Sequence, residues 1–284
     1  MPIEVNHLKA MYAAGTPFET QALQQVSLRI KDGEFVGIMG QTGCGKTTLI
    51  EMIAGLQQPS NGHVLLDGED IHAKGYDRNL LRKKIGVVFQ YPEQQLFETT
   101  VERDVAFALK HSELSQEQIR QRVEWALEQM GLCYGEIAHK SPLPLSGGEK
   151  RKVAIAGVMA VRPQILILDE PTAGLDPMSR QEFMKRIAEL NRQGTTILMV
   201  SHDADCLCEY AHRILVLQSG RLIMDGTPQQ VFAQKHADLP IGTSWVCAMA
   251  ETLYQAGKLP SPAITNYRDL LQAILNTRNG GDTP

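Results

Sequence analysis

The pattern G-x-x-x-x-G-K-[ST] occurs at residues 40–47, between an apolar run at 35–39 and another at 49–54. This order predicts a strand, a glycine-rich loop and a helix, which is the context in which the pattern binds phosphate. Backbone N–H groups converge on the phosphate, the helix N-terminus adds partial positive charge, and Lys46 reaches the β and γ oxygens. We expect Thr47 to offer its hydroxyl to Mg²⁺. The predicted phosphate contacts are Gly40, Gln41, Thr42, Gly43, Cys44, Gly45, Lys46, Thr47 and Thr48.

A second helix start with glycines lies further along the chain. Residues 145–149 read Leu-Ser-Gly-Gly-Glu and precede a helix expected over residues 150–160. Ser146 and Glu149 fit an ordinary capping box. Gly147 and Gly148, however, each cost about 1 kcal/mol of helix propensity relative to alanine, which a purely structural cap would avoid. We therefore predict that residues 146–149 form a second phosphate-binding device.

Two further apolar runs end in side chains with catalytic potential. Residues 165–168 lead into Asp169 and Glu170, and residues 195–200 lead towards His202. Continuous apolar runs are typical of parallel strands buried on both faces, and such strands deliver functional side chains at their carboxyl ends. Other core strands are expected near residues 35–39, 85–89 and 214–217.

In this order the motifs resemble those of the ATP-binding cassette (ABC) family of ATPases, over residues 4–227. The resemblance implies an α/β P-loop NTPase core with an antiparallel β subdomain and a helical subdomain at about residues 91–163. It also implies binding of ATP and Mg²⁺ and hydrolysis of ATP. Residues 228–284 lie outside the match, and we interpret them as a small helical appendage.

Three of the motifs concern the phosphates and the partner. Residues 40–47 match Walker A, and residues 145–149 match the signature. Residues 173–176 resemble the D-loop, which ends at Asp176, with Gly174 where relatives commonly have serine. In this family the signature of one chain faces the P-loop of another. Because the sequence has one copy of each motif, the resemblance implies pairing with a second ABC ATPase, either an identical copy or a paralogue.

The remaining motifs concern the metal and the chemistry. Gln90 matches the Q-loop glutamine and Asp169 the Walker B aspartate, so that both are expected near Mg²⁺ together with Thr47. Glu170 matches the catalytic glutamate, and His202 matches the switch histidine. Both are present, so the resemblance implies a chain that is competent for hydrolysis.

An aromatic residue near the N-terminus is expected to stack on adenine. Tyr12 is favoured, and Phe18 is the competitor. An aromatic residue in a strand is also commonly part of the core.

Longer stretches resemble the energy-coupling factor (ECF) ATPases. These are residues 91–97, 100–107 and 149–157, together with an insertion at 15–19. The resemblance implies two membrane partners, a transmembrane coupling subunit and a substrate-binding subunit, and import of vitamins or of cobalt or nickel ions. The insertion and the appendage favour the second of two paralogous ATPases. The alternatives are the ATPase of another ABC importer, or a non-transport ABC ATPase, which usually has two cassettes or long coiled-coil insertions.

Composition agrees with a cytoplasmic protein at the membrane face. No apolar run reaches the roughly 18 residues of a membrane span, and the start lacks the features of a signal peptide. The net charge of −4 disfavours nucleic acid as a partner. Five cysteines without disulfide spacing are typical of a reducing compartment. Cys44 is a variable loop position or, alternatively, a redox switch.

Two apolar patterns predict contacts with other chains. Leu96 and Phe97 follow the Q-loop and are expected to be exposed in a groove for helices of a membrane subunit. In the appendage, residues 246, 249, 250, 253 and 254 form one apolar stripe, and Leu270, Leu271 and Ile274 form another. The first stripe could pack on its own chain or on the tail of a second ATPase; we favour the second, as a dimerisation contact.

Overall fold

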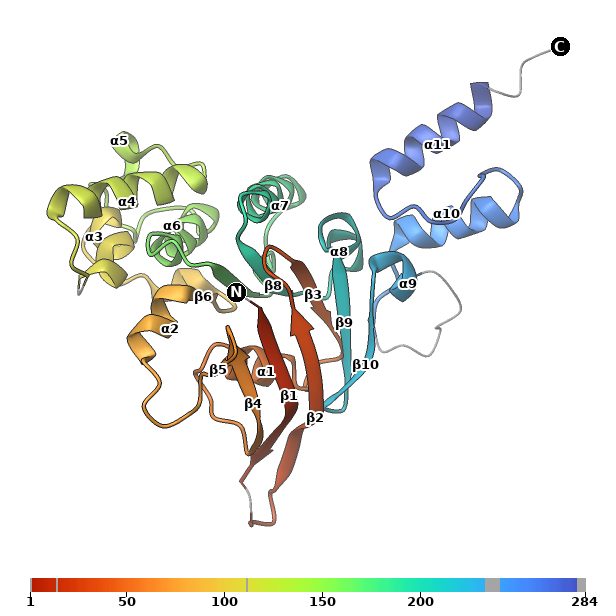
Figure 1. Cartoon of the computed structure of the whole chain (residues 1–284). Coiled ribbons are helices and arrows are strands. Elements are labelled where there is room, and N and C mark those ends of the chain that lie inside the picture. The colour runs from red at the N-terminus through yellow and green to blue at the C-terminus, as the bar shows by residue number, and fades with distance from the viewer. Residues whose placement is uncertain (1, 14, 111, 233–240, 280–284) are drawn as a thin grey trace.

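Two β-sheets form the centre of the chain and helices surround them (Figure 1). The computed structural model describes residues 2–13, 15–110, 112–232 and 241–279. The larger sheet has the strand order β10-β9-β3-β8-β7-β6 and the smaller one β2-β1-β4-β5. The strands of the larger sheet are β3 (Phe35–Met39), β6 (Ile85–Val88), β7 (Ile165–Asp169), β8 (Thr196–Val200), β9 (Arg213–Gln218) and β10 (Arg221–Gly226). Those of the smaller sheet are β1 (Ile3–Tyr12), β2 (Thr20–Ile30), β4 (Asn61–Leu66) and β5 (Glu69–Asp70).

Five strands of the larger sheet are parallel, and β10 is antiparallel to β9. Their apolar runs are continuous because the sheet is covered on both faces. In β7, Leu166 and Leu168 belong to one buried cluster with the helices, whereas Ile165 and Ile167 belong to a second cluster with the smaller sheet. The expected set of parallel core strands is confirmed, with ends that differ by one residue.

Helices follow most of these strands. Helix α1 (Lys46–Ile53) follows β3 and the glycine-rich loop, and α2 (Arg78–Lys84) precedes β6. The long helix α7 (Pro177–Arg192) covers the larger sheet, and α8 (Ala204–Tyr210) lies beside it (Figure 1). Phe183, Met184 and Ile187 of α7 are buried in the first cluster. The fold class expected from the sequence, an α/β ABC ATPase core, is the one observed.

A group of helices stands at one side of the sheets (Figure 1). It contains η1 (Pro92–Gln95), α3 (Val101–Ala106), η2 (Phe107–Leu109), α4 (Gln116–Gln129), α5 (Tyr134–Ile137) and α6 (Gly147–Met159). In α4 the capping box of Ser115 and Gln118 is formed, as the sequence predicts. Val123, Leu127 and Met130 are fully buried in the same core. The sequence pattern therefore located both the start and the buried face of α4.

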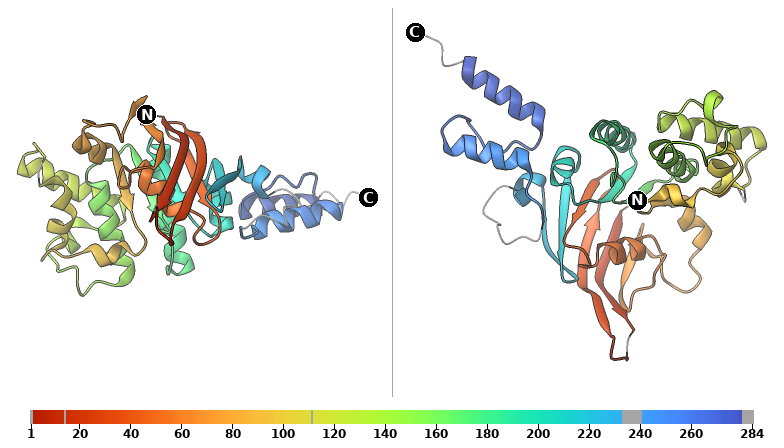
Figure 2. Two further views of the ribbon diagram at one scale, coloured as in Figure 1. Left: turned by 90° about the horizontal axis from the view of Figure 1, so that it is seen from below. Right: turned by 180° about the vertical axis from the view of Figure 1, so that it is seen from behind.

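The C-terminal helices project from the opposite side of the chain (Figure 2). They are α10 (Trp245–Gln255) and α11 (Tyr267–Asn279), whereas α9 (Pro228–Phe232) before them packs on the main core through Val231. Within the described residues, no helix combines the length and the apolar character needed to cross a membrane. Val246 and Ala250 of α10 are buried against Leu259 and Leu270, so this part has a small core of its own.

The expectation for the stripe on α10 needs a correction. Val246, Met249, Ala250 and Leu253 pack within the appendage, because α11 and the intervening segment return onto α10. Only Tyr254 of that stripe remains exposed. A different apolar surface faces solvent, on α11: Tyr267, Leu271, Ile274 and Leu275 are between 37% and 57% exposed.

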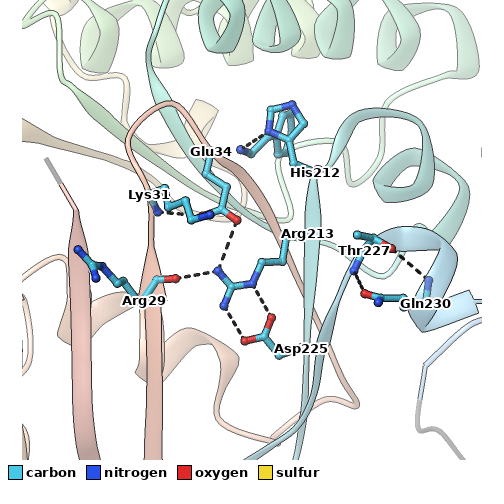
Figure 3. A network of polar contacts seen from close by, with 9 residues as sticks. Arg29, Lys31, Glu34, His212, Arg213, Asp225, Thr227 and Gln230 are labelled. Atoms are coloured by element: carbon cyan, nitrogen blue, oxygen red, sulfur yellow. Dashed lines mark hydrogen bonds and ion pairs between the residues drawn. The ribbon is translucent and has the colours of Figure 1, made fainter.

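A polar network ties the last strands to the smaller sheet (Figure 3). Arg213 of β9 forms a two-pronged ion pair with Asp225 of β10 and donates to the carbonyl of Arg29 in β2 at 2.7 Å. Close by, Thr227 and Gln230 cap α9, since each backbone N–H is bonded to the other's side chain. The chain therefore leaves β10 directly into α9, with the first turn already held by a cap.

Candidate nucleotide-binding site

A pocket of about 590 Å³ lies at the carboxyl ends of β3, β7 and β8. The loop after β3, the two acids after β7 and the histidine after β8 all line it because these strands are neighbours in the sheet. The predicted residues that line it are Tyr12, Thr42, Gly43, Gly45, Lys46, Thr47, Thr48, Gln90, Asp169, Glu170 and His202.

The loop before α1 is shaped by glycines that no other residue could replace. Gly40 has a φ of 148°, and a Cβ there would lie 2.3 Å from the carbonyl oxygen of Leu217. Gly45 has a φ of 105° and caps α1, and a Cβ there would lie 2.5 Å from the carbonyl oxygen of Ala22. Bare backbone N–H groups are thereby held at the helix N-terminus, which is a site for anions.

Lys46 bends back over this loop. Its Nζ donates to the carbonyls of Gly40 and Gln41 at 2.7 and 2.9 Å. The side chain is almost fully buried, yet it lines the pocket. Its charge is therefore fixed in position before any phosphate arrives. Cys44 is also buried and belongs to the cluster shared with the smaller sheet, so its side chain points inward from the loop.

Two acids stand at the end of β7. Thr47 donates from Oγ1 to Asp169 Oδ2 at 3.2 Å, and burial raises the pKa of Asp169. Burial also raises the pKa of Glu170, to about 7. Glu170 has a φ of 48°, a strained conformation for a residue with a side chain, and its Oε1 is buried without a hydrogen-bond partner. Strain and a buried oxygen without a hydrogen bond at one residue are typical of a functional position.

His202 faces the second acid from β8. Its Nε2 lies 3.4 Å from Glu170 Oε1, and burial followed by the charge of Lys46 lowers its pKa. The oxygens of Thr47 and Asp169, with the amide of Gln90 in the same pocket, are the hard ligands that Mg²⁺ prefers. The pocket therefore offers a cationic end at Lys46 and an acidic end suited to a metal.

Of the two candidates for adenine, only Tyr12 lines the pocket. Its hydroxyl contacts Thr48 Oγ1 at 3.1 Å and donates to Gln57 at 2.8 Å. Phe18 is 82% exposed and lies elsewhere. The wall next to Tyr12 is formed by Thr20, Gln21 and Ala22 of β2, which sequence reasoning missed because nothing in their residue types points to a ligand.

The signature residues lie outside this pocket. Ser146 and Glu149 form the predicted capping box of α6, and a Cβ at Gly147 or Gly148 would meet nothing within 4 Å. Packing within the chain therefore does not require these glycines. Asp176 is outside the pocket too: it caps α7 by accepting from the N–H groups of Met178 and Ser179.

Arg151 is a connection that sequence reasoning missed. It lies on α6, is 4% exposed, and binds both carboxylate oxygens of Glu93 at 3.1 Å. Its other nitrogen donates to the carbonyls of Pro171 and Ala173, directly after Glu170. One buried guanidinium thus joins the segment after Gln90, the signature helix and the catalytic loop. In sequence it is one of three consecutive basic residues, so nothing distinguishes it there.

Comparison with known proteins agrees with this site. The family model described as "ABC transporter" matches residues 23–173, which contain the glycine-rich loop, both acids and the signature. The chain belongs to the ABC transporter family of ATPases. An energy-coupling factor transporter ATP-binding protein EcfA2 from Symbiobacterium thermophilum is 43% identical over 290 residues. This alignment covers 100% of both chains. Another EcfA2, from Clostridium tetani, is 48% identical over 82% of this chain and 81% of its own length.

Two solved structures are similar to this ABC ATPase. One is cbiO1 from Clostridium perfringens, part of the transporter complex cbiONQ: it has a TM-score of 0.76 at 38% identity, over 90% of this chain and 96% of its own. The other is a dimeric ATP-binding cassette bound to ADP and phosphate after hydrolysis, with a TM-score of 0.71 at 31% identity, over 80% of this chain and 98% of its own. The similarity to EcfA2 extends through the appendage, so this ABC ATPase is of the ECF transporter type.

We predict opposite effects for two substitutions in the pocket. Lys46→Ala removes the fixed positive charge and should weaken ATP binding at least about 100-fold. Glu170→Gln keeps the shape and should retain binding while hydrolysis falls at least about 100-fold. Fluorescent-nucleotide titration and phosphate release measure the two effects, with the exposed Lys31→Ala as a control that changes neither. Undiminished turnover in Glu170→Gln would remove Glu170 from the chemistry.

For Arg151 we predict a defect in turnover. Arg151→Lys keeps the charge but loses the two-pronged contact with Glu93, so kcat should fall by about 10-fold or more while KM for ATP changes less than about 3-fold. Lys152→Ala is the matched control, because the neighbouring Lys152 forms only a partly exposed ion pair with Glu182. An increase in KM at constant kcat would contradict a positioning role for Arg151.

Proposed function

We propose that the chain is the ATP-binding and hydrolysing subunit of an energy-coupling factor importer, which takes up vitamins or transition-metal ions through separate membrane subunits. The observation that carries the proposal is that the chain has both halves of a nucleotide site but keeps them apart. Lys46, Glu170 and His202 share a pocket, and Ser146 with its two glycines lies outside it. A second ABC ATPase, identical or paralogous, supplies the missing half of each site.

In the shared site each side chain has a distinct task. Glu170 orients the attacking water and draws its proton, and His202 contacts the γ-phosphate. Lys46 neutralises charge on the β and γ oxygens, and Tyr12 stacks on adenine. Thr47, Asp169 and Gln90 would hold Mg²⁺, which when bound stabilises charge on the phosphates. Ser146 and the N–H groups of Gly147 and Gly148 close the far side of the other chain's nucleotide, while Asp176 lies in the loop that faces the partner.

The pocket connects to the membrane subunits through the helical part at about residues 91–163. Phe97 is 63% and Phe107 47% exposed, and their rings meet edge to face at 4.8 Å. Leu96, expected to be exposed beside Phe97, is instead half-buried against the core. An exposed aromatic pair is the kind of anchor that an interface uses. We infer that this pair receives a helix of the coupling subunit, at the cytoplasmic face of the membrane.

Arg151 connects the surface at Phe97 and Phe107 to the nucleotide pocket. Glu93 lies four residues before Phe97 and is held by Arg151, which also holds the loop after Glu170. Movement of the helical part is therefore transmitted to the catalytic loop through the Arg151 guanidinium, which donates to the carbonyls of Pro171 and Ala173. In the opposite direction, closure on ATP displaces the surface that the coupling subunit contacts.

The ATPase core at 1–227 and the appendage at 228–284 have separate tasks in the proposal. The exposed stripe of α11, formed by Tyr267, Leu271, Ile274 and Leu275, is the surface that we assign to the second ATPase. Its members recur at spacings of four, three and one, so that they share one helix face. A contact that persists without nucleotide would keep the two sites at high effective concentration.

The coupling surface predicts a separation of assembly from nucleotide binding. Phe97→Asp should lower recovery of the ATPase with the membrane subunits, and substrate uptake, by about 10-fold or more, because a charge is placed in an apolar contact. ATP affinity of the isolated chain should stay within about 2-fold. Phe18→Asp is the matched control, because Phe18 is another exposed aromatic residue, at 82% against 63% for Phe97, and lies outside the pocket. Normal assembly and uptake by Phe97→Asp would place the contact elsewhere.

The stripe on α11 predicts weaker pairing without nucleotide. Leu271→Asp with Leu275→Asp should weaken the nucleotide-free pair about 10-fold or more in analytical ultracentrifugation, with ATP affinity retained. Gln272→Asp with Asn276→Asp adds the same charge on another side of α11 and should change little. These surface changes are preferable to truncation after Thr227, which would remove Val231 from the core. An unchanged dissociation constant for the leucine variant would contradict the dimerisation role.

A further inference from the structure

The appendage is attached to the ATPase core beside the switch histidine. Helix α8 begins two residues after His202, and Asp205 on its first turn accepts from the Ser244 hydroxyl at 2.7 Å and from the Val246 N–H at 3.3 Å. Ser244 in turn caps α10 by accepting from the N–H of Cys247. The first turn of α10 is therefore seated on α8.

Two thiols meet in this contact. The sulfur atoms of Cys208 on α8 and Cys247 on α10 lie 3.7 Å apart, and the residues are 39 positions apart in sequence. Both are buried, at 3% and 7% exposure, and neither belongs to the nucleotide pocket. The chain has five free cysteines, and the others differ: Cys133 is exposed, Cys44 lies under the phosphate loop, and Cys206 packs in the main core.

We propose that Cys208 and Cys247 form a reversible disulfide that fastens α10 to α8. A disulfide has an S–S distance of about 2.05 Å, so the sulfur atoms have to approach by about 1.7 Å. Rotation about the Cα–Cβ bonds, with a small shift of α10 on α8, covers such a distance. The two residues belong to different helices with a long connection between them, so the bond would constrain the appendage rather than a local turn.

The chemistry needs a two-electron oxidant, and a hydroperoxide is the class that we assign. Contact with the Cys208 thiol lowers the pKa of Cys247 and raises the pKa of Cys208, so we assign Cys247 as the thiol that reacts first, in its thiolate form. The Cys247 thiolate attacks the peroxide O–O bond, giving a sulfenic acid and releasing hydroxide or alkoxide. The Cys208 thiol then attacks that sulfur: the S–S bond forms, the S–O bond breaks, and water leaves. Overall, two thiols lose two electrons and two protons, and the peroxide is reduced.

The disulfide would hold the appendage at a fixed angle to α8, the helix that follows His202. Because α8 follows His202 and α10 packs against α11, a bond from Cys208 to Cys247 joins the helix next to the switch histidine to the helix that supports the pairing surface of α11. In the reduced chain the same contact is held by the Asp205 hydrogen bonds and by packing alone. A dithiol reductant reverses the bond by thiol exchange.

The test is mass spectrometry of the full chain after hydrogen peroxide treatment. The oxidised protein is denatured with an alkylating agent, digested without reductant, and searched for linked peptides. We expect a peptide pair joined through Cys208 and Cys247, an intact mass lower by about 2 Da, and loss of both after dithiothreitol. Hydrogen exchange should show at least about 10-fold stronger protection of residues 245–255 in the oxidised form, since α10 can no longer leave α8.

Matched variants distinguish this pair from general oxidation. Cys208→Ser and Cys247→Ser should each abolish the linked peptide and the added protection, whereas Cys133→Ser and Cys206→Ser should leave both unchanged. Wild-type protein alone is decisive if a variant fails to fold. Oxidation that yields only sulfinic acids, or linkage of Cys208 and Cys247 no more frequent than linkage through the exposed Cys133, overturns the proposal.

Discussion

The nucleotide pocket depends on the burial of three neighbouring parallel strands. β3, β8 and β7 lie side by side in register, and each is apolar on both faces. A shift of one strand by a residue would exchange its two faces and move the side chain at its end. Burial between the helices and the smaller sheet therefore fixes where Lys46, Glu170 and His202 come together. The chemistry of the pocket is held in place by packing that lies away from it.

This arrangement explains what could be predicted from the sequence. The glycine-rich loop, the two acids and His202 follow apolar runs, and parallel strands carry their carboxyl ends to one edge, so pattern and spacing predicted the pocket. The capping boxes of Ser115 and Ser146 are local, and the structure forms both. The wall formed by Thr20, Gln21 and Ala22 was not predicted, because it depends on how the smaller sheet stacks on the larger one. The role of Arg151 was not predicted either, since its partners are distant in sequence. Two of them are backbone carbonyls, which every residue type has, so the sequence does not reveal them.

In the appendage, the sequence predicted an apolar helix face but not the surface that covers it. An apolar stripe on α10 has helical spacing whether it packs on its own chain or on another, and sequence alone leaves both possibilities open. In the structure, Leu259 and Leu270 cover most of that stripe, and the apolar side chains of α11 remain exposed. Which face is free depends on the return of the chain through residues 256–266, a segment without helical or strand periodicity. The contact of Cys208 with Cys247 was not predicted either, because it depends on how α10 packs on α8.

The central claim is that neither chain of the pair has a complete site by itself. The most direct measurement is a structure of the Glu170→Gln protein, with its partner ATPase, bound to ATP and Mg²⁺. The account predicts that the γ-phosphate held by Lys46 is contacted by the signature serine of the partner chain, while Ser146 of the same chain contacts the partner's nucleotide. Contact between Ser146 and the nucleotide in the P-loop of its own chain would contradict it.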